Sequence, residues 1–228
     1  MKLKQFMFSG LLMALLSILT VKSQAQVQIG VRAGVNFSNI SGEDSDGDKV
    51  EDNKLLPGFH AGITFDIPVA DEFAVQPGLL FSTKGVHFKE NDGDSYKQIP
   101  YYVEIPVNFL YKPELGNGRL LLGAGPYVAY GFGGKWKWKY EDETESGKLI
   151  FKNDLSDDDW ENLKDDEDYY GKPLDFGANL LAGYEFSNKL SLQLNAQLGM
   201  ANIAPKYNGQ KDGTMKNVGF GISLGYKF

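Results

Sequence analysis

The stretch that decides the fold is residues 27–38, which read VQIGVRAGVNFS. Apolar side chains occupy every second position, and mostly small or polar side chains lie between them. Successive side chains of a β-strand point to opposite faces, so this alternation predicts a strand with one apolar and one polar face. The last residues, 217–228, repeat the pattern as NVGFGISLGYKF.

Six further segments alternate in the same way, which gives eight predicted strands in all. They cover residues 58–68, 73–85, 98–112, 119–132, 174–186 and 190–201. The connections alternate in length, because those at 68–73, 113–118 and 187–189 are short, whereas those at 38–58, 86–97, 133–173 and 202–216 are longer. Consecutive antiparallel strands would place the short turns at one end and the long loops at the other, as in outer-membrane barrels.

Alternation alone does not say which face is outside, because a soluble lipocalin-like barrel also alternates. The exterior of a soluble barrel would carry many Lys and Glu, whereas the second face here is mostly Gly, Ser, Asn and Gln. We therefore expect an all-β fold, an eight-stranded antiparallel up-and-down transmembrane β-barrel with long external loops and short periplasmic turns. Five aromatic residues share the outward parity of the fifth strand and are expected at or above the outer aromatic girdle: Tyr130, Phe132, Trp136, Trp138 and Tyr140.

Composition excludes several function classes. The 228 residues include no cysteine, which excludes disulfides, cysteine-ligated zinc and a thiol nucleophile. The two histidines, His60 and His87, fall in no recognisable catalytic or metal motif. A net charge of −7 argues against nucleic-acid binding, which needs a basic face. The sequence thus predicts no enzymatic activity, no catalytic residues, no metal and no cofactor.

The first residues have the pattern of an export signal. Lys2 and Lys4 precede a mostly apolar stretch at 6–21, and the small residues Ser23 and Ala25 suit a cleavage site. A membrane anchor is the alternative, but the stretch is shorter than the ~20 residues of a spanning helix. We expect residues 1–25 to be a signal peptide and residues 26–228 to be the barrel domain, located in the cell outer membrane.

Four blocks of sequence resemble the PorT-like outer-membrane β-barrel family. They are GVRAGVN at 30–36, QPGLLFSTKG at 76–85, YVEIPV at 102–107 and GISLGYKF at 221–228. The resemblance covers the whole mature chain and implies an eight-stranded barrel in the outer membrane, with a C-terminal Phe read by the insertion machinery. It does not imply one activity, although a founding member assists a secretion system. The long acidic third loop is not a family hallmark.

Charges with lumen parity are few: Arg32, Asp66, Lys84, Glu104, Glu185 and Lys227. A charge inside a narrow lumen must be paired. Arg32 and Glu104 both fall near the middle of their strands and have opposite signs, so we predict that they form a structural ion pair across the lumen. A gated ion path is the alternative interpretation of the same charges.

Two external loops suggest binding. Asp44, Asp46 and Asp48 alternate as calcium ligands can, although Lys49 and Leu55 replace the Gly and Glu of an EF-hand, so a solvated acidic loop is the simpler interpretation. The third loop, residues 134–172, holds 13 acidic residues and seven lysines, and Ser156 could cap a short helix there. It is either a solvated, partly disordered loop or a docking surface, with Trp160 as the expected anchor for a partner.

These observations predict a non-enzymatic barrel with a structural or interaction role through its external loops, which includes assistance in secretion or surface assembly. Its expected partners are outer-membrane lipid and a protein at the external loops. A narrow solute or ion channel is the alternative function.

Overall fold

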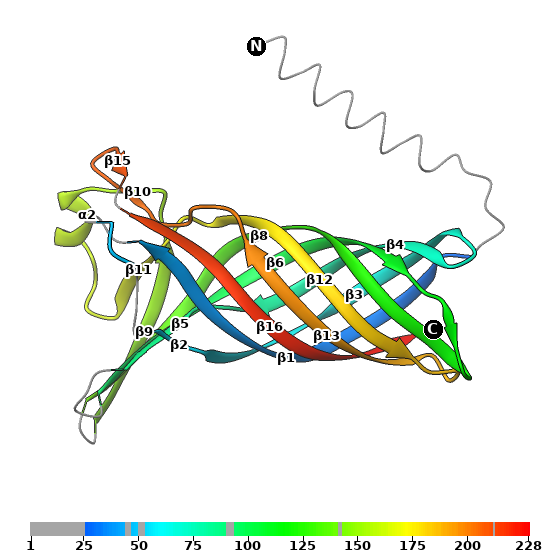
Figure 1. The fold of residues 1–228 in the computed structure, drawn as a ribbon. Helices are drawn as coiled ribbons and strands as arrows, with labels where there is room; N and C mark the ends of the chain where they lie inside the picture. Colours follow the sequence, from blue (N-terminus) through cyan, green and yellow to red (C-terminus); the bar gives the residue numbers. More distant parts are fainter. Residues whose placement is uncertain (1–25, 44–46, 50–52, 90–93, 141–142, 212) are drawn as a thin grey trace, which may run out of the picture.

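The computed structural model describes residues 26–43, 47–49, 53–89, 94–140, 143–211 and 213–228. Eight long antiparallel strands form a ring, and each is hydrogen-bonded to a neighbour on both sides (Figure 1). In chain order the ring strands are β1 (Gln28–Glu43), β3 (Leu56–Ala70), β4 (Phe73–Thr83), β6 (Ser95–Tyr111), β8 (Gly118–Tyr140), β12 (Leu174–Glu185), β13 (Leu190–Gly199) and β16 (Thr214–Lys227). The predicted fold class is confirmed, and each predicted strand overlaps one ring strand.

Pairing between the first and last strands closes the ring. The β1 and β16 ladder runs from Gly30 opposite Lys227 to Glu43 opposite Thr214, and β1 also pairs with β3 on its other edge. Closure satisfies the backbone groups of both edges, which lipid could not do. The short connections lie at one end of the ring, here called the turn end, and the long ones at the other, the loop end (Figure 1).

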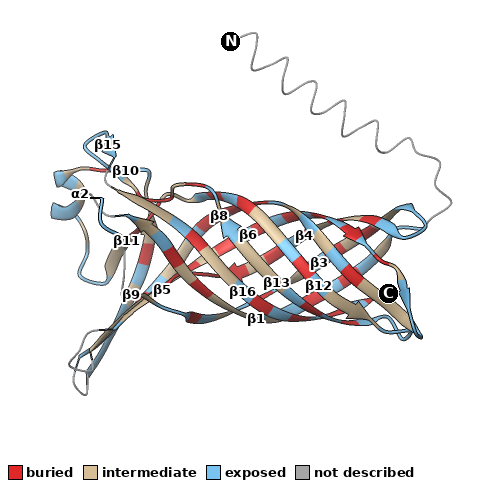
Figure 2. Cartoon of the chain, in the orientation of Figure 1, coloured by how far each residue is buried: buried red, intermediate tan, exposed pale blue. Residues whose placement is uncertain are grey.

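Burial alternates along the strands in the predicted sense (Figure 2). Val35, Ile105 and Leu194 are about half exposed on the outer face, whereas inward neighbours such as Glu104 and Gln193 are buried. The inner face therefore holds the polar groups, and the outer face is the apolar surface that a bilayer covers. Aromatic rings gather on the outer face near both ends, for example Phe81, Tyr101 and Phe132 at the loop end.

One expectation about the aromatic residues was wrong, because a β-bulge interrupts β8. Tyr101 pairs with Gly133 and Tyr102 with Gly131, so Phe132 is an extra residue in the β8 strand. An extra residue reverses the facing of all that follow. Tyr130 and Phe132 do point outward, as expected, but Trp136 turns inward and is only 9% exposed.

The loop end is more ordered than expected for residues 134–172. Strand β8 continues to Tyr140 and pairs with β9 (Glu143–Phe151), which pairs in parallel with β11 (Glu167–Gly171). The segment between β9 and β11 holds β10 (Asp154–Leu155) and α2 (Asp157–Glu161), and β10 joins the hairpin of β14 (Lys206–Tyr207) and β15 (Gln210–Lys211) from the last loop. The remaining strands are short: β2 (Asn53–Lys54), β5 (Val86–Lys89) and β7 (Glu114–Leu115).

The expected signal peptide, residues 1–25, lies outside the described residues. Within the described ranges, the helices are too short or too polar to cross a bilayer.

Candidate functional site: the lumen and the outer loops

The first candidate site is the lumen near the turn end, where four charged side chains form one network. Asp66 accepts hydrogen bonds from Lys112, at 2.8 Å, and from Lys227. Glu185 pairs with the same two lysines. The four side chains are at most 14% exposed. Two lysines alternate with two carboxylates, so the network is neutral.

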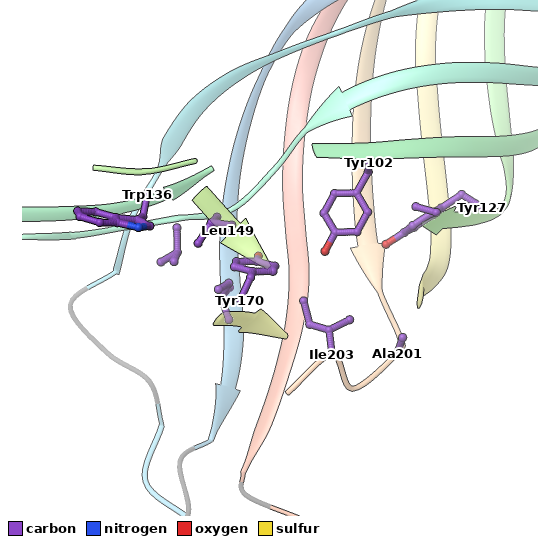
Figure 3. Packing of buried hydrophobic residues seen from close by; sticks show 10 residues of the cluster. Tyr102, Tyr127, Trp136, Leu149, Tyr170, Ala201 and Ile203 are labelled. Atoms are coloured by element: carbon purple, nitrogen blue, oxygen red, sulfur yellow. The ribbon is translucent and has the colours of Figure 1, made fainter. Parts of the chain in front are cut away.

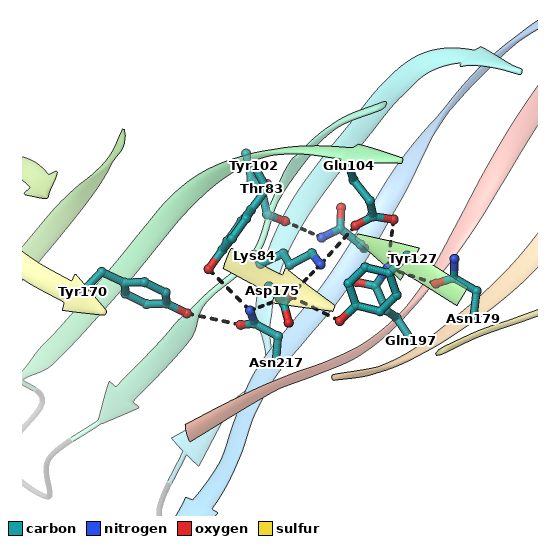
Figure 4. Close-up of polar contacts among 11 residues, drawn as sticks. Thr83, Lys84, Tyr102, Glu104, Tyr127, Tyr170, Asp175, Asn179, Gln197 and Asn217 are labelled. Atoms are coloured by element: carbon teal, nitrogen blue, oxygen red, sulfur yellow. Dashed lines mark hydrogen bonds and ion pairs between the residues drawn. The ribbon is translucent and has the colours of Figure 1, made fainter. Parts of the chain in front are cut away.

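A second network lies nearer the loop end (Figure 4). The Lys84 ammonium is 3.0 Å from a Glu104 oxygen and 3.2 Å from an Asp175 oxygen. Asn217 and Tyr127 donate hydrogen bonds to the same Asp175 oxygen, at 3.0 and 3.2 Å. The Lys84 ammonium also lies 4.4 Å from the centre of the Tyr127 ring, within the range of a cation–π contact. Every charge of this network is therefore held by several partners.

The predicted pair of Arg32 with Glu104 needs correction. Glu104 makes its ion pair with Lys84 and accepts a hydrogen bond from Gln197 at 2.9 Å. Within the described part of the chain, the ion pairs closer than 4 Å do not include Arg32. Arg32 is buried and is still attracted by the charge of Glu104, but at longer range. Lys84, and not Arg32, is the ion-pair partner of Glu104. The strands of a barrel are staggered, so two residues in the middle of their strands need not lie at the same height along the barrel axis.

A small cavity with polar and apolar lining adjoins the second network. It has about 60 Å³ of space, and its lining includes Arg32, Asn36, His60, Asn108 and Asn195. His60 exchanges a hydrogen bond of 2.7 Å with Ser223, which also accepts one from Asn195. A water molecule needs about 10–15 Å³ measured in this way, so the cavity suits a few water molecules and not an open pore.

Aromatic side chains close the loop end of the lumen (Figure 3). Tyr102 and Tyr127 come from the barrel wall, and Tyr170 comes from β11 in the third loop. The Tyr170 hydroxyl donates a hydrogen bond to Asn217 at 3.2 Å, and its ring meets Phe151 edge to face. Loop residues thus form part of the lumen plug, which the acidic composition of the third loop did not suggest.

Residues 152–169 of the third loop and residues 204–211 of the last loop build a platform at the loop end. Helix α2 starts after Ser156, as the sequence suggested, and the Asp159 carboxylate accepts hydrogen bonds from the Ser156 amide and hydroxyl, both at 2.9 Å. Lys152 bonds to the same carboxylate group, and these contacts lower the pKa of Asp159. Trp160 is 47% exposed and meets Tyr169 edge to face. Trp160, Tyr169 and Tyr207 line a surface pocket of about 430 Å³.

The other predicted features find less support. Residues 44–46 of the calcium candidate lie outside the described residues, so that interpretation stays a prediction. Across the described ranges, histidines and acidic residues form no cluster of three or more that could hold a metal. His87 lies on β5 opposite Lys54 and Lys97, whereas His60 lies on β3 opposite Ser82, so the two histidines are not register partners.

Sequence reasoning missed two central residues, Asp175 and Lys112. Asp175 has inward parity next to the outward Phe176, a signal that was present in the alternation of that strand. Lys112 follows the last residue of β6 and reaches back into the lumen. The inward parity of Tyr102 and Tyr127 was also present in the alternation of their strands, but the inner face was expected to be small and polar.

The fold and the polar lumen define a class, that of closed eight-stranded membrane barrels. The chain belongs to the outer membrane protein beta-barrel domain family, whose model matches residues 22–204. It is accordingly an outer-membrane protein, with its turn end toward the periplasm and its loop end outside.

Solved structures similar to the chain share little sequence with it. Ail, the attachment invasion locus protein of Yersinia pestis, crystallised with the heparin analogue sucrose octasulfate, is 14% identical, with 90% of this chain and 100% of that chain covered and a TM-score of 0.39. Neisserial surface protein A is 12% identical, with 90% and 100% covered and a TM-score of 0.42. OprG from Pseudomonas aeruginosa is 15% identical, with 88% and 95% covered and a TM-score of 0.37. No curated protein sequence matches the chain significantly.

Proposed function

We propose that this outer-membrane barrel is a closed, non-enzymatic interaction protein whose third and last outer loops dock a protein partner. The observation that carries the proposal is a contrast between the two candidate sites. The charges of the two lumen networks are paired within the barrel, whereas the platform leaves Trp160 and Tyr207 exposed at the surface pocket. Exposed aromatic side chains on an ordered support are the residues that most often anchor protein interfaces.

The charge of the platform indicates the kind of partner. Residues 153–168 hold nine acidic residues and one lysine, and most of them surround α2. A partner with a basic surface would meet complementary charge there, and salt would weaken the contact. Membership of the PorT-like proteins within this family is part of the proposal, and so is a role in secretion or surface assembly.

Cross-linking on intact cells tests the docking role. The variant Trp160→Ala should lose at least tenfold in recovery of the cross-linked partner, because truncating a central aromatic anchor commonly costs about 2 kcal/mol or more. Trp138→Ala is a matched control, since Trp138 is equally exposed, at 47%, but lies on the β8 and β9 hairpin away from the platform. Equal recovery with both variants would contradict the proposal.

Conductance of the purified barrel in planar bilayers tests the alternative function. A lumen closed by two networks and an aromatic plug should give no discrete current steps. Steady steps that change with Lys84→Met would instead favour a narrow ion channel.

A further inference from the structure

A row of basic side chains crosses the outer wall of the barrel at its loop end. Lys54 of β2 lies opposite His87 of β5, His87 opposite Lys97 of β6, and Lys97 opposite Lys137 of β8. The lysines next to this row on the same face are Lys89, Lys135 and Lys139. We call the six lysines 54, 89, 97, 135, 137 and 139 the lysine band.

The band works against the stability of the isolated protein. Like charges directly opposite each other on adjacent strands repel, yet Lys97 and Lys137 are such a pair. Burial and then the charges of Lys97, Lys54 and Lys89 lower the pKa of His87. Among the described residues, no lysine of the band forms an ion pair within 4 Å.

On the β8 and β9 hairpin the acidic side chains lie on the face opposite the lysine band, whereas Glu167 of β11, the register partner of Lys148, shares the face of the band. Glu143 and Glu145 of β9 are the register partners of Tyr140 and Trp138, and so they belong to the other face of the β8 and β9 hairpin. The chain as a whole has a net charge of −7, so a cationic face of this size is not a consequence of composition. It is complementary to an external anion.

The position of the band fits the membrane surface. Lys135 follows Phe132 by three residues and Lys97 precedes Tyr101 by four, which places them roughly 10–13 Å along the strands beyond that aromatic girdle. Lys97 has the same parity as the outward Tyr101, and Lys135 is opposite Ile99 of that parity, so both lie on the outward face of the wall. Lys135 is exposed and Lys97 is half-buried. Figure 1 shows β5 and β9 leaning away from the barrel axis at the loop end, which turns this face toward the membrane. Lysine stems can lie along apolar surface while their ammonium groups reach the headgroups.

We propose that the lysine band binds the phosphate groups of outer-leaflet lipid and so holds the barrel at a fixed depth. The partner is a phosphorylated lipid headgroup beside the wall, which is separate from the protein docked on the loop platform. Failure of one proposal therefore leaves the other standing.

The test is binding of fluorescent lipid A to the purified barrel in neutral detergent. The variant Lys97→Gln/Lys135→Gln/Lys137→Gln should weaken binding by up to about 100-fold, since each lysine near an anionic lipid surface contributes about fivefold. A control with the same change in charge, Lys164→Gln/Lys206→Gln/Lys211→Gln, alters exposed loop lysines outside the band and should change binding less than threefold. Unchanged heat-dependent gel migration shows that each variant is folded.

Two comparisons identify the ligand chemistry. Lipid A without its phosphates should bind the native barrel about as weakly as phosphorylated lipid A binds the band variant, and inorganic phosphate alone at millimolar concentration should not compete. Equal affinity for both lipids, or equal losses in the band and control variants, would overturn the proposal. Competition by free phosphate would also overturn it, because the site would then recognise a soluble anion and not a lipid.

Discussion

Replacing Lys84 with methionine should destabilise the barrel more than any single loss of a surface charge. The Lys84 ammonium lies between Glu104 and Asp175, at 3.0 and 3.2 Å, and the three side chains are at most 5% exposed. Methionine keeps most of the side-chain volume but leaves two carboxylates without their counter-charge. Breaking a buried ion pair in this way costs about 3–5 kcal/mol. Reversible urea unfolding from lipid vesicles measures the change in the free energy of unfolding.

Two further variants test the reasoning behind this magnitude. Arg119→Gln removes the exposed pair with Glu114, whose side chains are 43% and 79% exposed, and should cost about 0–1 kcal/mol. Adding Glu104→Gln and Asp175→Asn to Lys84→Met should restore most of the loss, because neutral amides need no cation. A loss below about 1 kcal/mol for Lys84→Met, or no recovery in the triple variant, would refute the assignment of Lys84 as the central cation.

Two other predictions concern the plug and the platform. Gly131→Val should loosen the plug, because a Cβ at Gly131 would lie 2.2 Å from the Phe151 ring. The expected result is faster amide hydrogen exchange in β9. Unchanged exchange would count against a packed plug. Acid should open the start of α2, because the pKa of Asp159 is below its ordinary value of 3.8. The ionised Asp159 carboxylate stabilises the fold fully above pH 3.8, and this stabilisation is lost as the pH falls through the lowered pKa. Trp160 fluorescence, in a chain where the other tryptophans are phenylalanine, should change at that acidic pH, and Asp159→Asn should abolish the transition.

The sequence was sufficient to predict the ring because a two-sided strand has a local signature. Val35 and Arg32 point to opposite faces because they are an odd number of positions apart in one strand, which the adjacent sequence alone indicates. The alternation also separates lipid-facing from lumen-facing residues, and the structure agrees for Ile105 and Glu104. Loop lengths then order the strands, since the three short connections join consecutive neighbours of the ring.

What the sequence could not predict depends on contacts between distant segments. The bulge at Phe132 reverses the facing of Trp136, and a single extra residue in a long strand leaves no periodic signal. Tyr170 enters the lumen because it bonds to Asn217 on β16, 47 residues further along the chain. Choosing Arg32 as the partner of Glu104 failed because the stagger of the barrel sets which levels meet, and alternation carries no information on stagger.

The pairing of β1 with β16 closes the ring, and the two lumen networks and the plug all require this closure. The chain has no cysteine, so Val35→Cys/Ile222→Cys introduces a single pair at facing positions on the outer surface. Mild oxidation of the folded barrel should link this pair, and the boiled, non-reduced chain should then migrate faster as a closed loop. Val35→Cys/Leu224→Cys is two positions out of register and should not link. Linkage of the shifted pair, or no linkage of either pair, would contradict closure in this register.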